Sequence, residues 1–161
     1  MKQFQLLLFI LIAALSTSAQ LVVHVQDGDT YKILKDGKLE TIRLANVDAP
    51  ELSQYYRPVV KQRVSNLILG KVVNVYPGKK DLYGRTIAKV AVGGRSLDSL
   101  LIANGWAWNY LPYSKYNFAL SVYESQAKIA GLGMWHCQHN VPPWIWRQFN
   151  KRQKRLNEMC R

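Results

Sequence analysis

The chain is poor in cysteine and in long apolar segments, and each shortage argues against a class of protein. It holds 2 cysteines among 161 residues, too few for a disulfide framework. A zinc site is not expected, because His136, Cys137 and His139 lack a second ligand pair at the usual spacing. The apolar run 6–15 is well short of the ~20 residues that span a bilayer, so a membrane anchor is not expected either.

Acidic residues are also scarce, with 10 Asp and Glu against 22 Lys and Arg, for a formal charge of +12. A chain this basic favours phosphate-rich or other anionic partners, although charge alone does not determine a fold. With 48% hydrophobic and 20% charged residues, the composition is that of a globular protein and excludes disorder and collagen-like repetition. The length suits one domain with a substantial core.

The N-terminal segment has the pattern of a secretory signal peptide. Lys2 precedes the apolar run, and Thr17 and Ala19 stand at the two positions that a signal peptidase reads. Cleavage after Ala19 predicts a secreted or periplasmic protein with no stable membrane association. In an oxidising compartment, Cys137 and Cys160 either pair and tie the tail to the body or remain free thiols.

The distribution of positive charge marks a boundary in the rest of the chain, near Val141. The segment after Val141 has six bases and one acid, and the body before it keeps a net charge of +6. We therefore expect a signal peptide at 1–19, a folded body at 20–141 and a basic tail at 142–161. Basic pairs in the tail either follow the phosphates of a longer substrate or form a solvated helix face.

Strand patterns come first in the body and helical patterns follow. Asp36-Gly37 is a strong hairpin signal between two β-rich runs. Strands are expected at 21–26, 30–34, 39–44, 72–76 and 86–92, and helices at 58–69, 97–103 and 118–130. These elements predict an α+β fold, a five-stranded OB-type β-barrel with about three packed helices.

Residues able to do chemistry gather in three short stretches: 27–30 (Asp-Gly-Asp-Thr), 43–51 (Arg-Leu-Ala-Asn-Val-Asp-Ala-Pro-Glu) and 81–85 (Asp-Leu-Tyr-Gly-Arg). In the second stretch an Arg, an Asp and a Glu lie in one loop. Such a loop would serve phosphodiester hydrolysis, in which a cation polarises the phosphoryl group, the Glu handles the water and the Arg neutralises phosphate charge. Taken singly, each stretch also fits a simple turn, a surface ion pair or a hairpin.

The order and spacing of the three stretches together resemble the staphylococcal nuclease (thermonuclease) family. The resemblance continues through Gly105-Trp106-Ala107, the helix that contains Glu124 and Ala127, and Gly133-Met134-Trp135, and it covers about residues 21–136. It implies an endonuclease, a monomeric phosphodiester hydrolase that depends on Ca²⁺, acts on DNA and also on RNA, and leaves 3′-phosphates.

The resemblance also implies a metal site. Asp29 and Asp48 match the calcium carboxylates, and the backbone carbonyl of Ala49 matches a third ligand. Several family members have Thr at that position, but a backbone ligand tolerates Ala. Asp27 matches an outer acid that supports the ligands without binding the ion.

Catalytic and substrate-binding roles follow in the same way. Glu51 is similar to the family's water-positioning or general-base Glu, and Arg43 and Arg85 to the arginines on the scissile phosphate. Tyr83 resembles a nucleotide-contacting Tyr. Tyr113, with Tyr110 as the alternative, aligns with the base-packing tyrosines, and core packing is an equally good interpretation of either residue. Leu82 stands where some members have a basic residue.

Two other functions remain open. A non-catalytic OB-fold module that binds nucleic acid would keep the fold, but such modules lose the acids and arginines that this chain retains. A basic secreted protein that binds anionic envelope polymers would explain the charge, but not the placement of the carboxylates.

Overall fold

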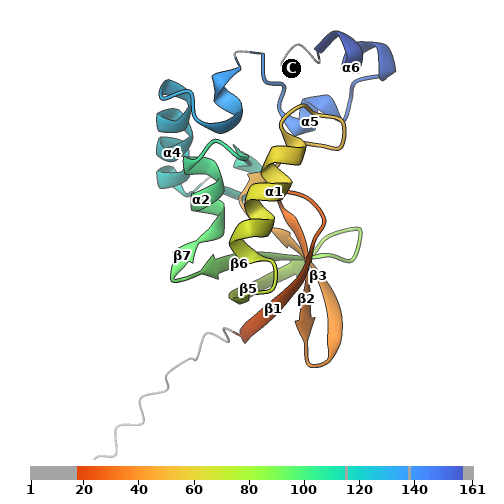
Figure 1. The fold of residues 1–161 in the computed structure, drawn as a ribbon, viewed down its shortest axis with the longest axis vertical. Helices are drawn as coiled ribbons and strands as arrows, with labels where there is room; N and C mark the ends of the chain where they lie inside the picture. The colour runs from red at the N-terminus through yellow and green to blue at the C-terminus, as the bar shows by residue number, and fades with distance from the viewer. Residues whose placement is uncertain (1–17, 115, 138, 158–161) are drawn as a thin grey trace, which may run out of the picture.

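A computed structural model of the chain describes residues 18–114, 116–137 and 139–157 (Figure 1). The predicted signal peptide falls almost wholly outside these residues, and so does Cys160, the predicted partner of Cys137. Cys137 itself is not a free thiol. None of the helices in the described ranges is long and apolar enough to cross a membrane.

Five strands form a closed barrel. They are β1 (Ser18–Val25), β2 (Thr30–Lys35), β3 (Lys38–Leu44), β5 (Val72–Lys80) and β6 (Thr86–Val92). Neighbours in the order β3-β2-β1-β5-β6 are antiparallel, and a parallel pairing of β3 with β6 closes the barrel. At the β2–β3 turn, Asp36 and Gly37 both have positive φ, as an Asp-Gly hairpin requires. The predicted OB-type barrel is confirmed.

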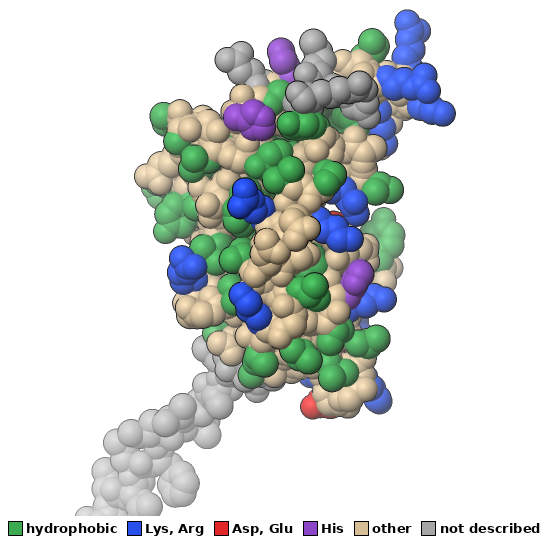
Figure 2. Space-filling model, in the orientation of Figure 1, with side chains coloured by type: hydrophobic (Ala, Val, Ile, Leu, Met, Phe, Trp, Pro, Cys, Tyr) green, Lys and Arg blue, Asp and Glu red, His purple; other side chains and the backbone are tan. Residues whose placement is uncertain are grey.

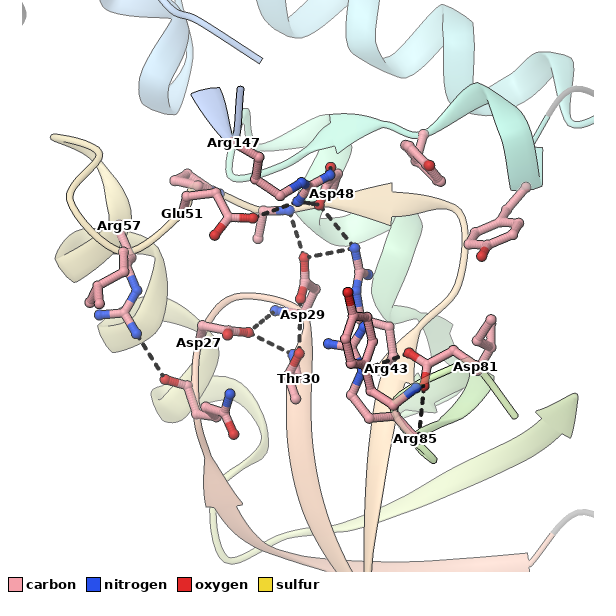
Figure 3. A pocket seen from close by; sticks show the side chains of 18 residues that line it. Asp27, Asp29, Thr30, Arg43, Asp48, Glu51, Arg57, Asp81, Arg85 and Arg147 are labelled. Atoms are coloured by element: carbon pink, nitrogen blue, oxygen red, sulfur yellow. Dashed lines mark hydrogen bonds and ion pairs between the residues drawn. The ribbon is translucent and has the colours of Figure 1, made fainter. Parts of the chain in front are cut away.

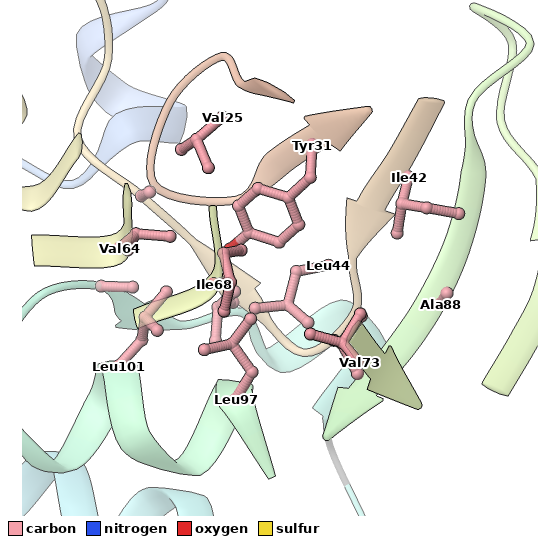
Figure 4. Close-up of a cluster of buried hydrophobic side chains, with 14 of the residues drawn as sticks. Val25, Tyr31, Ile42, Leu44, Val64, Ile68, Val73, Ala88, Leu97 and Leu101 are labelled. Atoms are coloured by element: carbon pink, nitrogen blue, oxygen red, sulfur yellow. The ribbon is translucent and has the colours of Figure 1, made fainter. Parts of the chain in front are cut away.

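Three longer helices form where the sequence predicts them: α1 (Arg57–Ile68), α2 (Leu97–Ala103) and α4 (Phe118–Ile129). Helices α1 and α2 pack on the barrel, and α4 packs on α2 (Figure 1). Alternate strand residues such as Ile42 and Leu44 point inward because side chains on a strand change face at every residue. They pack against Val64 of α1 and Leu97 and Leu101 of α2, all of which are buried (Figure 4). This core holds the barrel rigid beneath the loops at its end.

Several short elements escape the sequence patterns. Strands β4 (Val47–Asp48) and β8 (Trp108–Asn109) pair with each other, and β7 (Arg95–Ser96) extends the edge next to β6. The short helices are α3 (Leu111–Ser114) and the 3₁₀ turn η1 (Gly133–His136). Elements of two to four residues are too short to show a periodicity, which is why the sequence gives no sign of them.

The segment after Val141 folds back onto the body. It contains α5 (Pro143–Trp146) and α6 (Lys151–Asn157). Trp146 is 3% exposed and its indole N–H donates to the Ser53 hydroxyl at 3.3 Å, while the Gln54 amide donates to the Val141 carbonyl at 2.7 Å. The predicted basic tail is therefore attached to the loop between β4 and α1.

Candidate active site

A cleft of about 580 Å³ lies at one end of the barrel. Its walls come from the β1–β2 turn, the β3–β4 loop and the segment that follows it, the β5–β6 hairpin, the start of α3 and Arg147 after α5 (Figure 3). All three chemistry-bearing stretches of the sequence reach this cleft. Arg43, Glu51 and Arg85 line it together with Asp27, Asp29, Asp48 and Ala49.

The Asp27–Thr30 turn aims one carboxylate at the cleft and uses the other to hold itself together. Asp27 Oδ1 accepts the backbone N–H groups of Asp29 at 3.1 Å and Thr30 at 2.8 Å. Gly28 is required because a Cβ there would lie 2.6 Å from Ala49 Cβ and from Val60 Cγ1. The turn therefore packs tightly against α1 and leaves Asp29 in a fixed position.

Asp29 and Asp48 converge on one guanidinium group. Arg43 Nη2 lies 3.3 Å from Asp29 Oδ2 and 3.0 Å from Asp48 Oδ1 (Figure 3). The guanidinium is held from behind, since Arg43 Nη1 donates to the carbonyls of Leu44 at 2.7 Å and Val47 at 2.9 Å. Asp29 Oδ2 also accepts the Ala49 N–H at 2.7 Å. The two carboxylates are 6% and 2% exposed, so their positions are set by the fold.

The carboxylates of this cluster lie close together, and the pKa values of Asp27 and Asp48 are raised. Burial, with the neighbouring charge of Asp29, raises the pKa of Asp27 to about 6. Burial also raises the pKa of Asp48, against hydrogen bonding from Arg147. For Arg43, burial opposes the charged form, but Asp29 and Asp48 outweigh it and raise its pKa. The site thus favours bound positive charge.

The predicted metal donors fit a hard cation by their chemistry. Within the described ranges, no group of three or more His, Cys, Asp and Glu side chains is arranged to hold a metal ion. The predicted set consists instead of two carboxylates, Asp29 and Asp48, with the Ala49 carbonyl. Oxygen donors of this kind, completed by water, are what Ca²⁺ and similar ions prefer. Both buried carboxylates converge on one Arg43 nitrogen, so in this structure the Arg43 guanidinium neutralises them together.

Glu51 lies on the wall of the cleft beside Asp48 (Figure 3). Its side chain is 33% exposed, which leaves it open to water. Its backbone N–H donates to the Gln54 side-chain oxygen at 2.7 Å, and Pro50 before it is buried. These restraints fix the backbone from which the carboxylate reaches into the cleft.

Arg85 enters from the β5–β6 hairpin and is oriented by Asp81. Its Nε lies 2.7 Å from Asp81 Oδ2, while Asp81 Oδ1 accepts the backbone N–H groups of Tyr83 and Arg85, each at 2.9 Å. Despite desolvation, the hydrogen bonds from Arg85 lower the pKa of Asp81. Gly84 occupies a left-handed φ of 78° at the turn. Asp81 is a positioning residue to which the sequence pattern assigned no role.

Tyrosines form part of the cleft rim. Tyr83 is 84% exposed, and its ring lies 5.4 Å from the Arg85 guanidinium. Tyr110 and Tyr113 both line the cleft and pack edge to face with their centroids 5.1 Å apart. Tyr113 is 47% exposed, so it is not a core residue.

Arg147 is a charged cleft residue that the sequence patterns do not mark. Its Nη2 lies 2.8 Å from Asp48 Oδ2, and its Nη1 lies 2.5 Å from Glu51 Oε1 (Figure 3). No motif marks it, because it stands in the predicted tail, 99 positions from Asp48. A usable signal was the Pro-Pro-Trp-Ile-Trp run just before it, since buried tryptophans dock a segment on a body and so place the next side chain.

Comparison with known proteins supports one family. The family described as "Staphylococcal nuclease homologue" matches residues 41–137. An uncharacterized endonuclease of Escherichia coli O157:H7 is 37% identical over 127 residues, which are 78% of this chain and 82% of that protein. An uncharacterized endonuclease of Haemophilus influenzae is 34% identical over 155 residues, 94% of this chain and 84% of that protein.

A micrococcal nuclease of Shigella flexneri is 33% identical over 140 residues, 81% of this chain and 80% of that protein. The family match includes Arg43, Asp48, Glu51 and Arg85, and it excludes Arg147. The chain has a closed OB-type barrel with a cleft lined by arginines and carboxylates, and it matches both the family and these relatives. The chain therefore belongs to the staphylococcal nuclease family.

Proposed function

We propose that this protein is an exported, calcium-dependent endonuclease that hydrolyses phosphodiester bonds in both DNA and RNA. Membership of the family makes it a nuclease, an endonuclease-type hydrolase whose family requires a metal. Calcium as the ion, the breadth of substrate, export and the roles of individual residues are the proposal. Its main support is that Asp29, Arg43, Asp48, Glu51 and Arg85 line one cleft from three separate chain segments.

In the proposed mechanism, Glu51 orients the attacking water and accepts its proton. A carboxylate that is one-third exposed on the cleft wall suits this task, because it meets solvent and faces the substrate site. Attack at phosphorus breaks the bond to the 5′-oxygen, which takes a proton from solvent water and leaves as a 5′-hydroxyl, while the other product ends in a 3′-phosphate. Ca²⁺ held by Asp29, Asp48 and the Ala49 carbonyl would supply Lewis-acid polarisation of the phosphoryl group.

The arginines stabilise charge on the phosphoryl oxygens. Arg85 is aimed by Asp81 on one side of the cleft, and Arg43 is fixed by the backbone carbonyls of Leu44 and Val47. Guanidinium groups donate paired hydrogen bonds to phosphate in a way that an ammonium group does not. Tyr83 and Tyr113, exposed at the rim, would contact nucleotides on either side of the scissile bond.

The two rival functions explain less of the site. A binding module has no use for a partly exposed Glu beside paired buried aspartates, and a protein that binds envelope polymers has no use for a cleft with carboxylates at its centre. We propose that the protein acts as a monomer in the periplasm or outside the cell.

One assay tests the core of the proposal. The mature protein from Gln20 onward is incubated with DNA and with RNA in Ca²⁺, in Mg²⁺ and in excess chelator, and the product ends are analysed. We expect Ca²⁺-dependent cleavage that leaves 3′-phosphates. Glu51→Gln should lose about 100- to 1000-fold in kcat with unchanged thermal stability. Asp36→Asn, on an exposed hairpin, is the matched control and should cleave normally.

Chelator-resistant cleavage would contradict the calcium site, and full activity of Glu51→Gln would contradict the role of Glu51. Export is tested separately by fractionation of cells that express the full chain. Protein retained in the cytoplasm with residues 1–19 intact would contradict the signal peptide.

A further inference from the structure

Arg147 occupies a special position among the arginines of the cleft. Two of its nitrogens bridge two different carboxylates, with Nη2 on Asp48 and Nη1 on Glu51. A second contact places Nη1 3.4 Å from Asp48 Oδ1. Because Arg43 also donates to Asp48 Oδ1, both oxygens of the Asp48 carboxylate are engaged by guanidinium groups. Those oxygens include the donors that the proposed metal site needs.

The two guanidinium groups are held very differently. Arg43 is 13% exposed and has two backbone carbonyls as additional acceptors, so it is part of the framework. The Arg147 side chain is 46% exposed. Within the described part of the chain, its guanidinium hydrogen bonds go to Asp48 and Glu51 alone. Arg147 can therefore leave without opening the barrel.

A divalent cation at Asp48 and the Arg147 guanidinium compete for one oxygen, Oδ2, because Arg43 already donates to Oδ1 from the framework. An ion bound to carboxylate oxygens lies about 2.3–2.6 Å from them, and Arg147 lies 2.8 Å from Asp48 Oδ2. Both positive groups would then meet within a few ångströms at a buried carboxylate, where water screens their repulsion poorly. Binding of the cation at Oδ2 therefore favours departure of Arg147, which is the more exposed of the two guanidinium groups.

We propose that Arg147 is a built-in competitor of the divalent cation: it occupies Asp48 and Glu51 when the metal is absent and is displaced when the metal binds. The inference rests on the metal site of the proposed function and adds to it a residue beyond the family match at residues 41–137. In this proposal the α5 segment lowers the affinity for the metal, because Trp146 holds Arg147 over the site.

The size of the effect follows from the stability of the closed ion pair. A charge-assisted hydrogen bond of this kind keeps the closed arrangement at roughly 90–99% of the population. Apparent affinity falls by the fraction of molecules that are competent to bind. Removing the guanidinium should therefore tighten binding of Ca²⁺ by about 10- to 100-fold.

The test is calorimetric titration of Ca²⁺ into the metal-stripped mature protein and two variants. Arg147→Gln removes the competing charge, and Arg155→Gln removes one charge from the same C-terminal segment. Arg155 is exposed on α6 and forms no ion pair within the described ranges. Figure 2 shows basic side chains gathered at this end of the molecule, so the control measures their general repulsion of a cation. We expect about 10- to 100-fold tighter binding for Arg147→Gln and less than about threefold for Arg155→Gln.

A second measurement follows the side chain itself. The Nε–H signal of Arg147 is assigned in ¹⁵N spectra as the one missing from Arg147→Gln. Addition of Ca²⁺ to the unmodified protein should shift it more than any signal from α6. Equal or weaker Ca²⁺ binding by Arg147→Gln, an equal gain in Arg155→Gln, or a signal that stays unmoved at saturating Ca²⁺ would each overturn the inference.

Failure of the inference and failure of the proposed function look different. If the unmodified protein binds Ca²⁺ and cleaves, while Arg147→Gln binds no more tightly, then only the role of Arg147 is wrong. If neither protein binds Ca²⁺ and neither cleaves, the metal site is wrong, and the competition fails with it.

Discussion

At the scale of single residues, the cleft is an arrangement of mutually neutralising charges. Asp48 is 2% exposed, and an unpaired carboxylate at that depth would cost several kcal/mol. Arg43 and Arg147 offset this cost from opposite sides. Asp27 has no guanidinium partner among the described residues, and its Oδ1 accepts two backbone N–H groups. Asp27, the acid proposed to support the metal site, is therefore the carboxylate whose burial cost is offset least.

The shifted pKa of Asp27 predicts a stability that depends on pH. Its folded-state pKa of about 6 lies above the unfolded value of about 3.9. The charge therefore costs nothing below about pH 4, and the penalty grows as pH rises through about 6. Asp27→Asn keeps the acceptor oxygen and removes the charge. We expect it to raise the free energy of unfolding by about 1–2 kcal/mol at pH 7 in chelator.

Denaturant unfolding at pH 4, 5, 6 and 7 checks this prediction. The gain should vanish at pH 4, where both proteins carry an uncharged side chain at this position. If Asp27→Asn is instead less stable at pH 7, then the hydrogen bonds from Asp29 and Thr30 outweigh the burial of the charge.

At the scale of elements, short turns at the end of a rigid barrel supply the site. The barrel strands fix where each turn starts, and one internal carboxylate then fixes each turn: Asp27 between β1 and β2, and Asp81 between β5 and β6. The two turns therefore hold Asp29, the proposed metal carboxylate, and Arg85, the proposed phosphate-binding arginine, in fixed relation to each other. The position of each proposed functional side chain thus depends on a neighbouring carboxylate in its own turn.

Asp81 gives the sharpest test of this view. Asp81→Asn keeps acceptors for the backbone N–H groups but weakens the charged contact to Arg85 Nε. We expect kcat to fall by about 10-fold, with KM changed less than about twofold, because Arg85 acts mainly on charge that develops in the transition state. Asp81→Ala should lose more, since the turn also loses its two acceptor contacts. A normal kcat for both variants would show that Arg85 finds its position without Asp81.

Elements with a clear periodicity were predictable, and contacts between distant segments were not. Strands such as β3 alternate inward and outward residues, and the Asp36-Gly37 turn sets their register, so local sequence defines the barrel. The pairing of β4 with β8 joins residues about 60 positions apart and has no local signature. Arg147 reaches Asp48 across 99 positions, and only tertiary packing of the tryptophans before it brings them together.

At the scale of the whole molecule, the C-terminal segment is part of the folded body as well as a reservoir of positive charge. The predicted boundary near Val141 separates compositions, but Trp146 buries its side chain across that boundary and hydrogen-bonds Ser53. A polyanion drawn to this basic end would therefore meet a segment whose position is linked to the cleft through Arg147. Under the proposal, attraction of the substrate and the state of the metal site are connected through the packing of this segment, in which Trp146 contacts Ser53 and the Val141 carbonyl accepts from Gln54.

That connection predicts the effect of Trp146→Ala. Loss of a buried Trp should lower the free energy of unfolding by about 3–5 kcal/mol, measured by denaturant titration. Leu156→Ala is the control in the same segment, because Leu156 is 64% exposed and its loss should cost less than about 0.5 kcal/mol. Trp146→Ala should also tighten Ca²⁺ binding, by less than Arg147→Gln does, since the guanidinium remains present but is no longer held over Asp48. Equal free energies of unfolding for the two alanine variants would mean that buried Trp146 adds no more to the fold than exposed Leu156 does. Arg147 would then reach the site from a segment that the packing of Trp146 does not hold in place.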